Sequence, residues 1–90
     1  MTHETTTTLG AEEVIRRARE FFAQRVPAAG AFVEAESARH VVLRGQGGEE
    51  VVIAAVPRAG GSAVRGSTLL FDQQVRRFLS TLPPGEVETA

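Results

Sequence analysis

Two carboxylates and an imidazole stand close together in the sequence and are the first candidates for chemistry. Glu34, Glu36 and His40 are separated by even numbers of residues, so on one uninterrupted strand their side chains would share a face. Such a set could hold a divalent cation or act as a general acid and base. A turn at Ser37-Ala38 would break this parity, and a metal site needs three or four convergent ligands. We therefore expect a solvated strand face here, with neither a metal ion nor a catalytic group.

A second candidate is an anion site where an extended segment passes into the C-terminal helix. Arg65, Ser67 and Thr68 combine a guanidinium group with two hydroxyls, and a helix N-terminus would add free backbone N–H groups. Serine and threonine at such a position more commonly cap the helix, while Gly66 bends the chain. The segment is not a P-loop, because the chain contains no lysine. Anion binding by these residues is thus an alternative to simple helix capping.

Composition excludes several classes of function. The 90 residues include no cysteine, which removes disulfides, thiolate metal sites and a cysteine nucleophile. The sequence also lacks the G-x-S-x-G turn that presents a catalytic serine. The net charge is −1, and no aromatic residues accompany the arginines of the predicted strands, so nucleic acid is not an expected partner. We expect a non-catalytic protein that uses no cofactor.

The expected location is the cytoplasm. The first eight residues lack the charged and apolar regions of a signal peptide. No apolar run approaches the length of about 18 residues that a membrane span requires, so a membrane is not an expected partner. All ten basic residues are arginine, which is typical of GC-rich coding, and we expect a bacterial source.

Hydrophobic spacing predicts one helix near each end of the chain. Within residues 10–25, Val14, Ala18 and Phe22 recur at helical intervals. A second apolar stripe comprises Phe71, Val75, Phe78, Leu79 and Leu82. The C-terminal helix ends at Pro83-Pro84-Gly85. Its first residue is left open, because Ser67, Thr68 or Asp72 could each act as the cap.

Between the helices the apolar period changes to two, which predicts four strands. They cover residues 31–36, 39–45, 49–57 and 62–65, with glycine-rich connections after the second and the third. The third is the most apolar and reads as a strand that is buried on both faces. Strands that follow each other closely in sequence pair as an antiparallel meander.

The predicted fold is therefore α+β, in the order α-β-β-β-β-α. We expect a two-layer sandwich in which a four-stranded antiparallel meander carries an N-terminal and a C-terminal helix. Residues 1–8 and 85–90 lack apolar periodicity, so disordered tails are expected around a single domain over residues 9–84.

An apolar sheet face carries the functional hypothesis. Val42, Val52, Ala54 and Val56 have the parity opposite to the strand residues expected to face the helices, which are Val41, Leu43, Val51, Ile53 and Ala55. If both helices share one side of the sheet, these residues form an open patch that a partner would cover. If one helix lies on each side, the same residues are buried within the monomer.

We expect an interaction or assembly module that oligomerises through the sheet face, since a domain of 90 residues has a thin core. The element order looks like that of a shortened helix-grip domain of the START-like kind. This resemblance implies an alternative function, a small carrier that binds an apolar ligand between the sheet and the C-terminal helix. A small enzyme that uses Glu34, Glu36 and His40 is the third and least favoured hypothesis.

Overall fold

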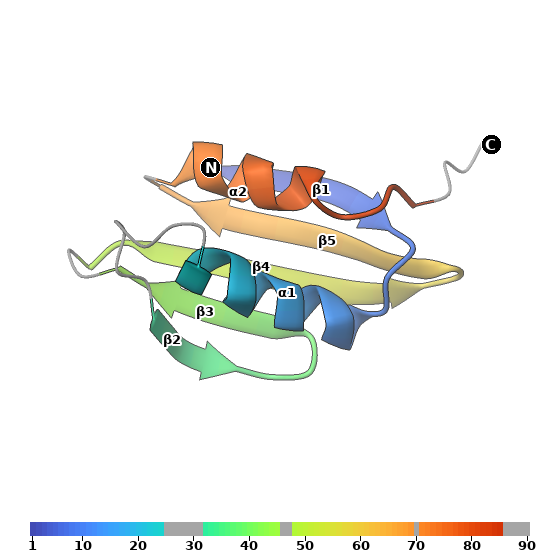
Figure 1. Ribbon diagram of the computed structural model, residues 1–90, viewed down its shortest axis with the longest axis horizontal. Helices are drawn as coiled ribbons and strands as arrows, with labels where there is room; N and C mark the ends of the chain where they lie inside the picture. Colours follow the sequence, from blue (N-terminus) through green and yellow to red (C-terminus); the bar gives the residue numbers. More distant parts are fainter. Residues whose placement is uncertain (25–31, 46–47, 70, 86–90) are drawn as a thin grey trace.

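The computed structural model describes residues 1–24, 32–45, 48–69 and 71–85. These residues form an α+β domain with one antiparallel sheet and two helices (Figure 1). In chain order the elements are β1 (Thr2–Thr7), α1 (Ala11–Gln24), β2 (Phe32–Glu36), β3 (His40–Arg44), β4 (Glu50–Arg58), β5 (Gly61–Thr68) and α2 (Asp72–Ser80). The predicted helix end at residue 25, the predicted strand start at residue 31 and the hairpin residues 46–47 lie outside the described residues.

The sheet has five strands rather than the predicted four. Their spatial order is β1-β5-β4-β3-β2, and every neighbouring pair is antiparallel (Figure 1). The meander from β2 to β5 is confirmed. The additional strand, β1, lies at the edge beside β5, and its register runs from Thr2 opposite Ser67 to Thr7 opposite Ser62.

The prediction of a disordered tail over residues 1–8 is therefore wrong. Threonine is β-branched and favours extended structure, but it carries no apolar signal that periodicity could detect. The side of β1 that faces the helices holds His3, Thr5 and Thr7, and Thr7 is 2% exposed. β1 is thus held by backbone pairing and by polar side chains instead of an apolar stripe.

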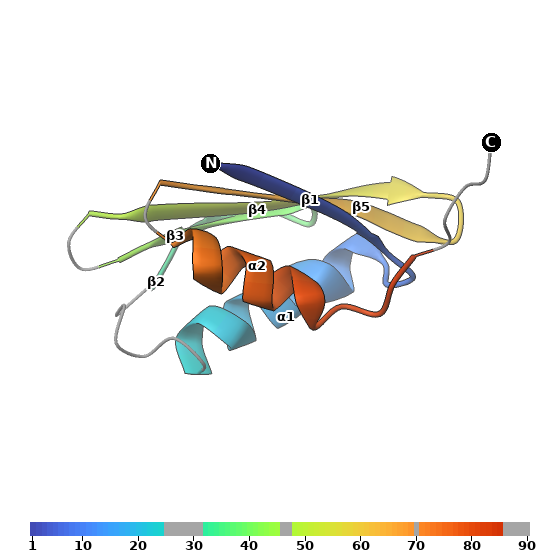
Figure 2. The ribbon, with the colours of Figure 1, turned by 90° about the horizontal axis from the view of Figure 1, so that it is seen from above.

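Both helices lie on the same side of the sheet (Figure 2). The core fills the space between them and the strands, and the five strand residues expected to face the helices, Val41, Leu43, Val51, Ile53 and Ala55, are all buried. Phe22 of α1 and Phe78 of α2 are fully buried, with ring centroids 6.1 Å apart. One continuous apolar cluster therefore joins the two helices and the sheet.

Helix α2 begins at Asp72, but none of the three residues predicted as its cap is the N-cap. Phe71 is its N-cap and provides no side-chain cap, while the Thr68 hydroxyl, at the end of β5, accepts a hydrogen bond from the Phe71 N–H at 3.1 Å. The helix packs closely on β5 because Gly66 has no side chain. A Cβ atom there would lie 2.5 Å from Cγ1 of Val75.

Contacts at both of its ends attach β1 to the C-terminal part of the chain. His3 Nε2 lies 2.7 Å from Oδ1 of Asp72, and this hydrogen bond lowers the pKa of the Asp72 carboxyl. The Gly85 N–H donates to the Thr6 carbonyl at 3.0 Å. Gly85 is therefore ordered against β1, and the rest of the predicted second tail, residues 86–90, lies outside the described residues.

Candidate functional site

Side-chain alternation gives the sheet one face toward the helices and one face away from them. In β4, Val51, Ile53 and Ala55 are buried under the helices, and the residues between them point to the other side. Neither helix covers that side (Figure 2). We term it the open face, and on the three central strands it consists of His40, Val42, Arg44, Glu50, Val52, Ala54, Val56, Arg58, Ala63, Arg65 and Ser67.

The four residues predicted as an interface all lie on the open face and form one group. Val42 of β3 is directly opposite Val52 of β4, and Val56 is opposite Ala63 of β5. Ala54 lies between the two valines of β4. Val56 is 55% exposed, whereas the other four are partly covered by their neighbours. We term these five residues the valine patch.

A shallow hollow of about 710 Å³ lies at one end of the valine patch. Val56 and Ala63 line it, together with the guanidinium-bearing residues Arg58 and Arg65. Protein–protein interfaces combine apolar side chains with arginine, and this hollow has the same combination in its lining.

Ion pairs flank the valine patch on two sides. Arg44 Nε donates to Glu34 at 2.8 Å and its Nη2 donates to Glu50 at 3.0 Å. The bond to Glu34 is the main reason that the pKa of Arg44 is raised. On the other side, Arg65 donates to Glu4 of β1 at 2.9 and 3.0 Å. Cations and anions alternate around the patch, so neither sign of charge dominates it.

The structure does not bring the predicted anion-binding residues together. Strand β5 continues to Thr68, so alternation places Arg65 and Ser67 on the open face and Thr68 on the helix side. Thr68 is 6% exposed, and its hydroxyl donates to the Glu50 carbonyl at 3.0 Å. The guanidinium group is already paired with Glu4. These three residues therefore do not form a shared site at a helix N-terminus.

Glu34, Glu36 and His40 do not converge either. A bulge in β2 shifts the register at Glu34, which breaks the parity of the two carboxylates. Glu36 pairs with Arg19 of α1 at 2.8 Å, and His40 Nδ1 shares a hydrogen bond with the Ser37 hydroxyl. Within the described parts of the chain, no three acidic, histidine or cysteine side chains are grouped so that they could hold a metal ion.

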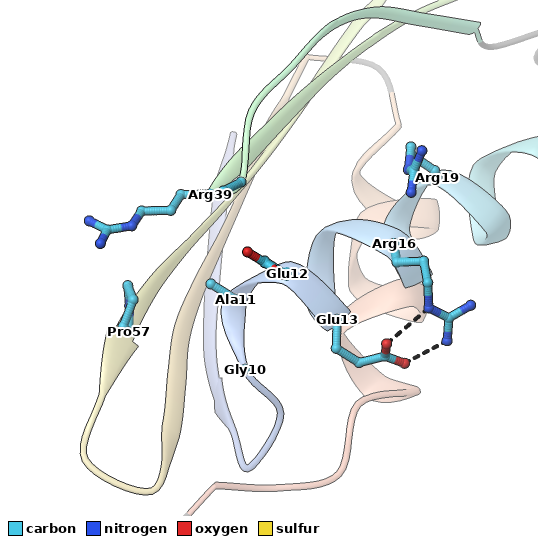
Figure 3. Close-up of a pocket in the computed structure, with 9 residues that line it drawn as sticks. Gly10, Ala11, Glu12, Glu13, Arg16, Arg19, Arg39 and Pro57 are labelled. Carbon is cyan, nitrogen blue, oxygen red and sulfur yellow. Dashed lines mark hydrogen bonds and ion pairs between the residues drawn. The ribbon is translucent and has the colours of Figure 1, made fainter.

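A hollow of about 860 Å³ lies between α1 and the connection from β2 to β3 (Figure 3). Arg16 donates two hydrogen bonds to Glu13 there, at 2.6 and 2.9 Å, and Arg39 points away from the helix. Among the described residues that line this hollow, none carries a hydroxyl or an imidazole. The charged groups of its lining are the carboxylates of Glu12 and Glu13 and the guanidinium groups of three arginines.

Sequence reasoning missed two members of the open face that bear on its chemistry. Ala63 extends the valine patch onto β5, and Arg58 ends the row of open-face residues on β4. Both have the parity of their open-face neighbours, so extending the alternation to the ends of both strands would have found them. Also, no helix among the residues described here is long and apolar enough to cross a membrane.

Comparison with known proteins gives no further assignment. No family model matches the chain, and no curated protein and no solved structure matches it.

Proposed function

We propose that the protein is a non-catalytic assembly module that binds a second copy of itself through the open face of its sheet. The observation that carries the proposal is the valine patch on a sheet face that neither helix covers. Contiguous apolar surface of this kind commonly marks a protein–protein contact, because association removes it from water.

The charges around the patch favour a second copy as the partner. Arg44 and Arg65 are paired within the chain, so the open face presents both signs instead of one strong potential. Two copies of a surface with balanced charge can pack against each other, whereas two strongly acidic or two strongly basic surfaces repel each other. Two sheets also pack face to face at a separation of about 10 Å in β-sandwiches, which seals the inner faces of both.

The carrier hypothesis has less support. It requires space for a ligand between the sheet and α2, and fully buried side chains occupy that region. Phe22, Phe78 and Val75 are 0–1% exposed, and the Phe78 ring contacts both aromatic rings of α1. Side chains buried against one another in this way favour a packed core over a ligand pocket, which usually measures about 300 Å³ or more.

Replacing Val52 by glutamate tests the proposal. A carboxylate in the middle of an apolar interface loses its hydration and finds no partner, so Val52→Glu should convert an oligomer to a monomer. The molar mass is measured by light scattering after size exclusion, and circular dichroism checks the fold. Val33→Glu is the matched control, because Val33 is an exposed valine on β2, opposite the buried Leu43 and away from the valine patch.

Val56→Glu serves as a second variant in case Val52→Glu fails to fold. Val56 is 55% exposed within one chain, so a charge there costs an isolated monomer little. The proposal is supported if the wild type and Val33→Glu are oligomeric while Val56→Glu is a folded monomer. A wild type that stays monomeric at all concentrations overturns it, as does a Val56→Glu variant that assembles normally.

A further inference from the structure

We infer that the two copies pack with their β4 strands antiparallel, related by a twofold axis that passes through Ala54 at right angles to the strands. This inference rests on the proposed self-association and adds its geometry. It is carried by the order of charged and apolar residues along the open face of β4.

The open-face residues of β4 form a self-complementary series about Ala54. They are, in order, Glu50, Val52, Ala54, Val56 and Arg58, and the buried residues between them face the helices. An anion ends the series on one side and a cation ends it on the other, at equal distances from the centre. Turning a second copy about Ala54 therefore places Glu50 over Arg58, and Val52 over Val56, on both sides of the axis.

The alternative twofold axis, parallel to the strands, gives a much poorer match. It places every β4 residue over its own counterpart, so that Glu50 meets Glu50 and Arg58 meets Arg58. Like charges that face each other across an interface oppose association. The charge order on β4 thus selects the antiparallel arrangement.

The charges at the two ends of β4 are available for such pairing. At one end, Glu34 and Glu50 share the single guanidinium of Arg44, which leaves an excess of negative charge. At the other end, Arg58 is exposed and makes no ion pair within the described part of the chain. Each copy therefore offers a surplus anion and a free cation at the positions that the antiparallel arrangement superposes.

The neighbouring strand fits the same axis. On β5, Ser67 and Ala63 lie two residues on either side of Arg65, which is opposite Ala54. The axis places Ser67 of one copy over Ala63 of the other. Both side chains are small, so they do not hold the two sheets apart. The axis also brings the two Arg65 side chains, with the Glu4 side chains beside them, together on the axis. Each guanidinium group there is neutralised by the hydrogen-bonded Glu4 of its own chain.

Charge reversal on β4 tests the arrangement. Arg58→Glu and Glu50→Arg should each raise the dissociation constant of the dimer roughly tenfold or more, because each places like charges together twice. The double variant restores opposite charges at both ends and should return the constant to within about threefold of the wild type. The constant is measured by sedimentation equilibrium on the full chain. Arg77→Glu on α2 is the control, with the same change of charge on an exposed residue of the helix side.

The outcomes separate this inference from the proposed function. Recovery in the double variant supports the antiparallel axis, since an axis parallel to the strands leaves like charges facing in every variant. If the single variants leave the dimer unchanged, or the double variant stays as weak as the singles, the axis is wrong while self-association through the patch still stands. A wild type that is monomeric overturns both.

Cross-linking provides a second measurement that does not depend on affinity. The chain contains no cysteine, so introduced thiols are the only ones present. In a mixture of Glu50→Cys and Arg58→Cys chains, a short bis-maleimide should join unlike chains, because the two positions face each other across the axis. Each variant alone should give little product, since its own two thiols stand far apart. Efficient cross-linking within either single variant overturns the antiparallel arrangement.

Discussion

Glu13 is the residue whose ionisation the fold perturbs most clearly. It lies in the first turn of α1 and accepts hydrogen bonds from Arg16 at 2.6 and 2.9 Å, and from Arg17 at 2.9 Å. The bonds from Arg16, followed by those from Arg17, lower the pKa of Glu13 from 4.5 to about 2. A carboxylate near a helix N-terminus also interacts favourably with the helix dipole.

The lowered pKa of Glu13 predicts how the stability of the protein changes with pH. A carboxyl that is more acidic in the folded state stabilises the fold above its unfolded pKa, and this contribution is lost as the pH falls through the folded value. For Glu13 the loss runs between pH 4.5 and about 2. Thermal unfolding of Glu13→Gln should therefore show a shallower decline across this range than the wild type. Glu12→Gln is the control, and equal slopes for all three proteins would contradict the prediction.

Among the elements, β1 shows most clearly where sequence reasoning fails. Apolar periodicity found α1 and β4 because these elements bury valine, isoleucine and phenylalanine, and burial of apolar surface is what such a pattern reports. β1 instead buries Thr7 and satisfies His3 with the carboxylate of Asp72. The run of β-branched threonines was the available signal, but threonine is also common in loops.

The start of α2 shows a related failure. Ser67 and Thr68 are typical helix caps, but pairing with β4 extends β5 through both of them. Alternation then separates their side chains onto opposite faces, which removes the anion site that they were predicted to form with Arg65. By contrast, the parity of Val52 and Val56 predicted their common face correctly, because both lie well inside a regular strand.

Removing β1 should destabilise the protein, although the sequence alone predicts that residues 1–7 are dispensable. The deletion removes the backbone pairing with β5 and uncovers buried groups such as Ser62 and Gly66. Each backbone hydrogen bond contributes about 0.5–1.5 kcal/mol, and one kcal/mol corresponds to ~4–8 °C in a domain of this size. We expect the melting temperature, followed by circular dichroism, to fall by at least about 10 °C.

A conservative variant controls for the change in sequence. Thr2→Ser keeps the backbone of β1 and alters only an exposed side chain, so its melting temperature should stay close to that of the wild type. An unchanged melting temperature in the deletion variant would mean that β5 is stable as an edge strand without β1.

At the scale of the whole molecule, self-association couples stability to concentration. When only the folded chain dimerises, mass action raises the melting temperature as the protein becomes more concentrated. At protein concentrations above the dissociation constant, a tenfold increase in concentration raises the free energy of unfolding by about 0.7 kcal/mol per chain. This corresponds to a rise of ~3–5 °C in the melting temperature. We expect this rise for the wild type and a flat response for Val56→Glu. A flat response in both would argue against a dimer.

The position of β1 also has a consequence for the order in which the molecule is made. Its pairing partner β5 follows α1 and the three other strands, so Thr7 meets Ser62 only after most of the chain exists. On the ribosome, β1 therefore emerges well before β5, the strand with which it pairs. Pairings between segments so distant in sequence require closing a long loop, which slows folding. Until then the threonines of β1 stay in water, and a polar segment tolerates that delay better than an apolar one would.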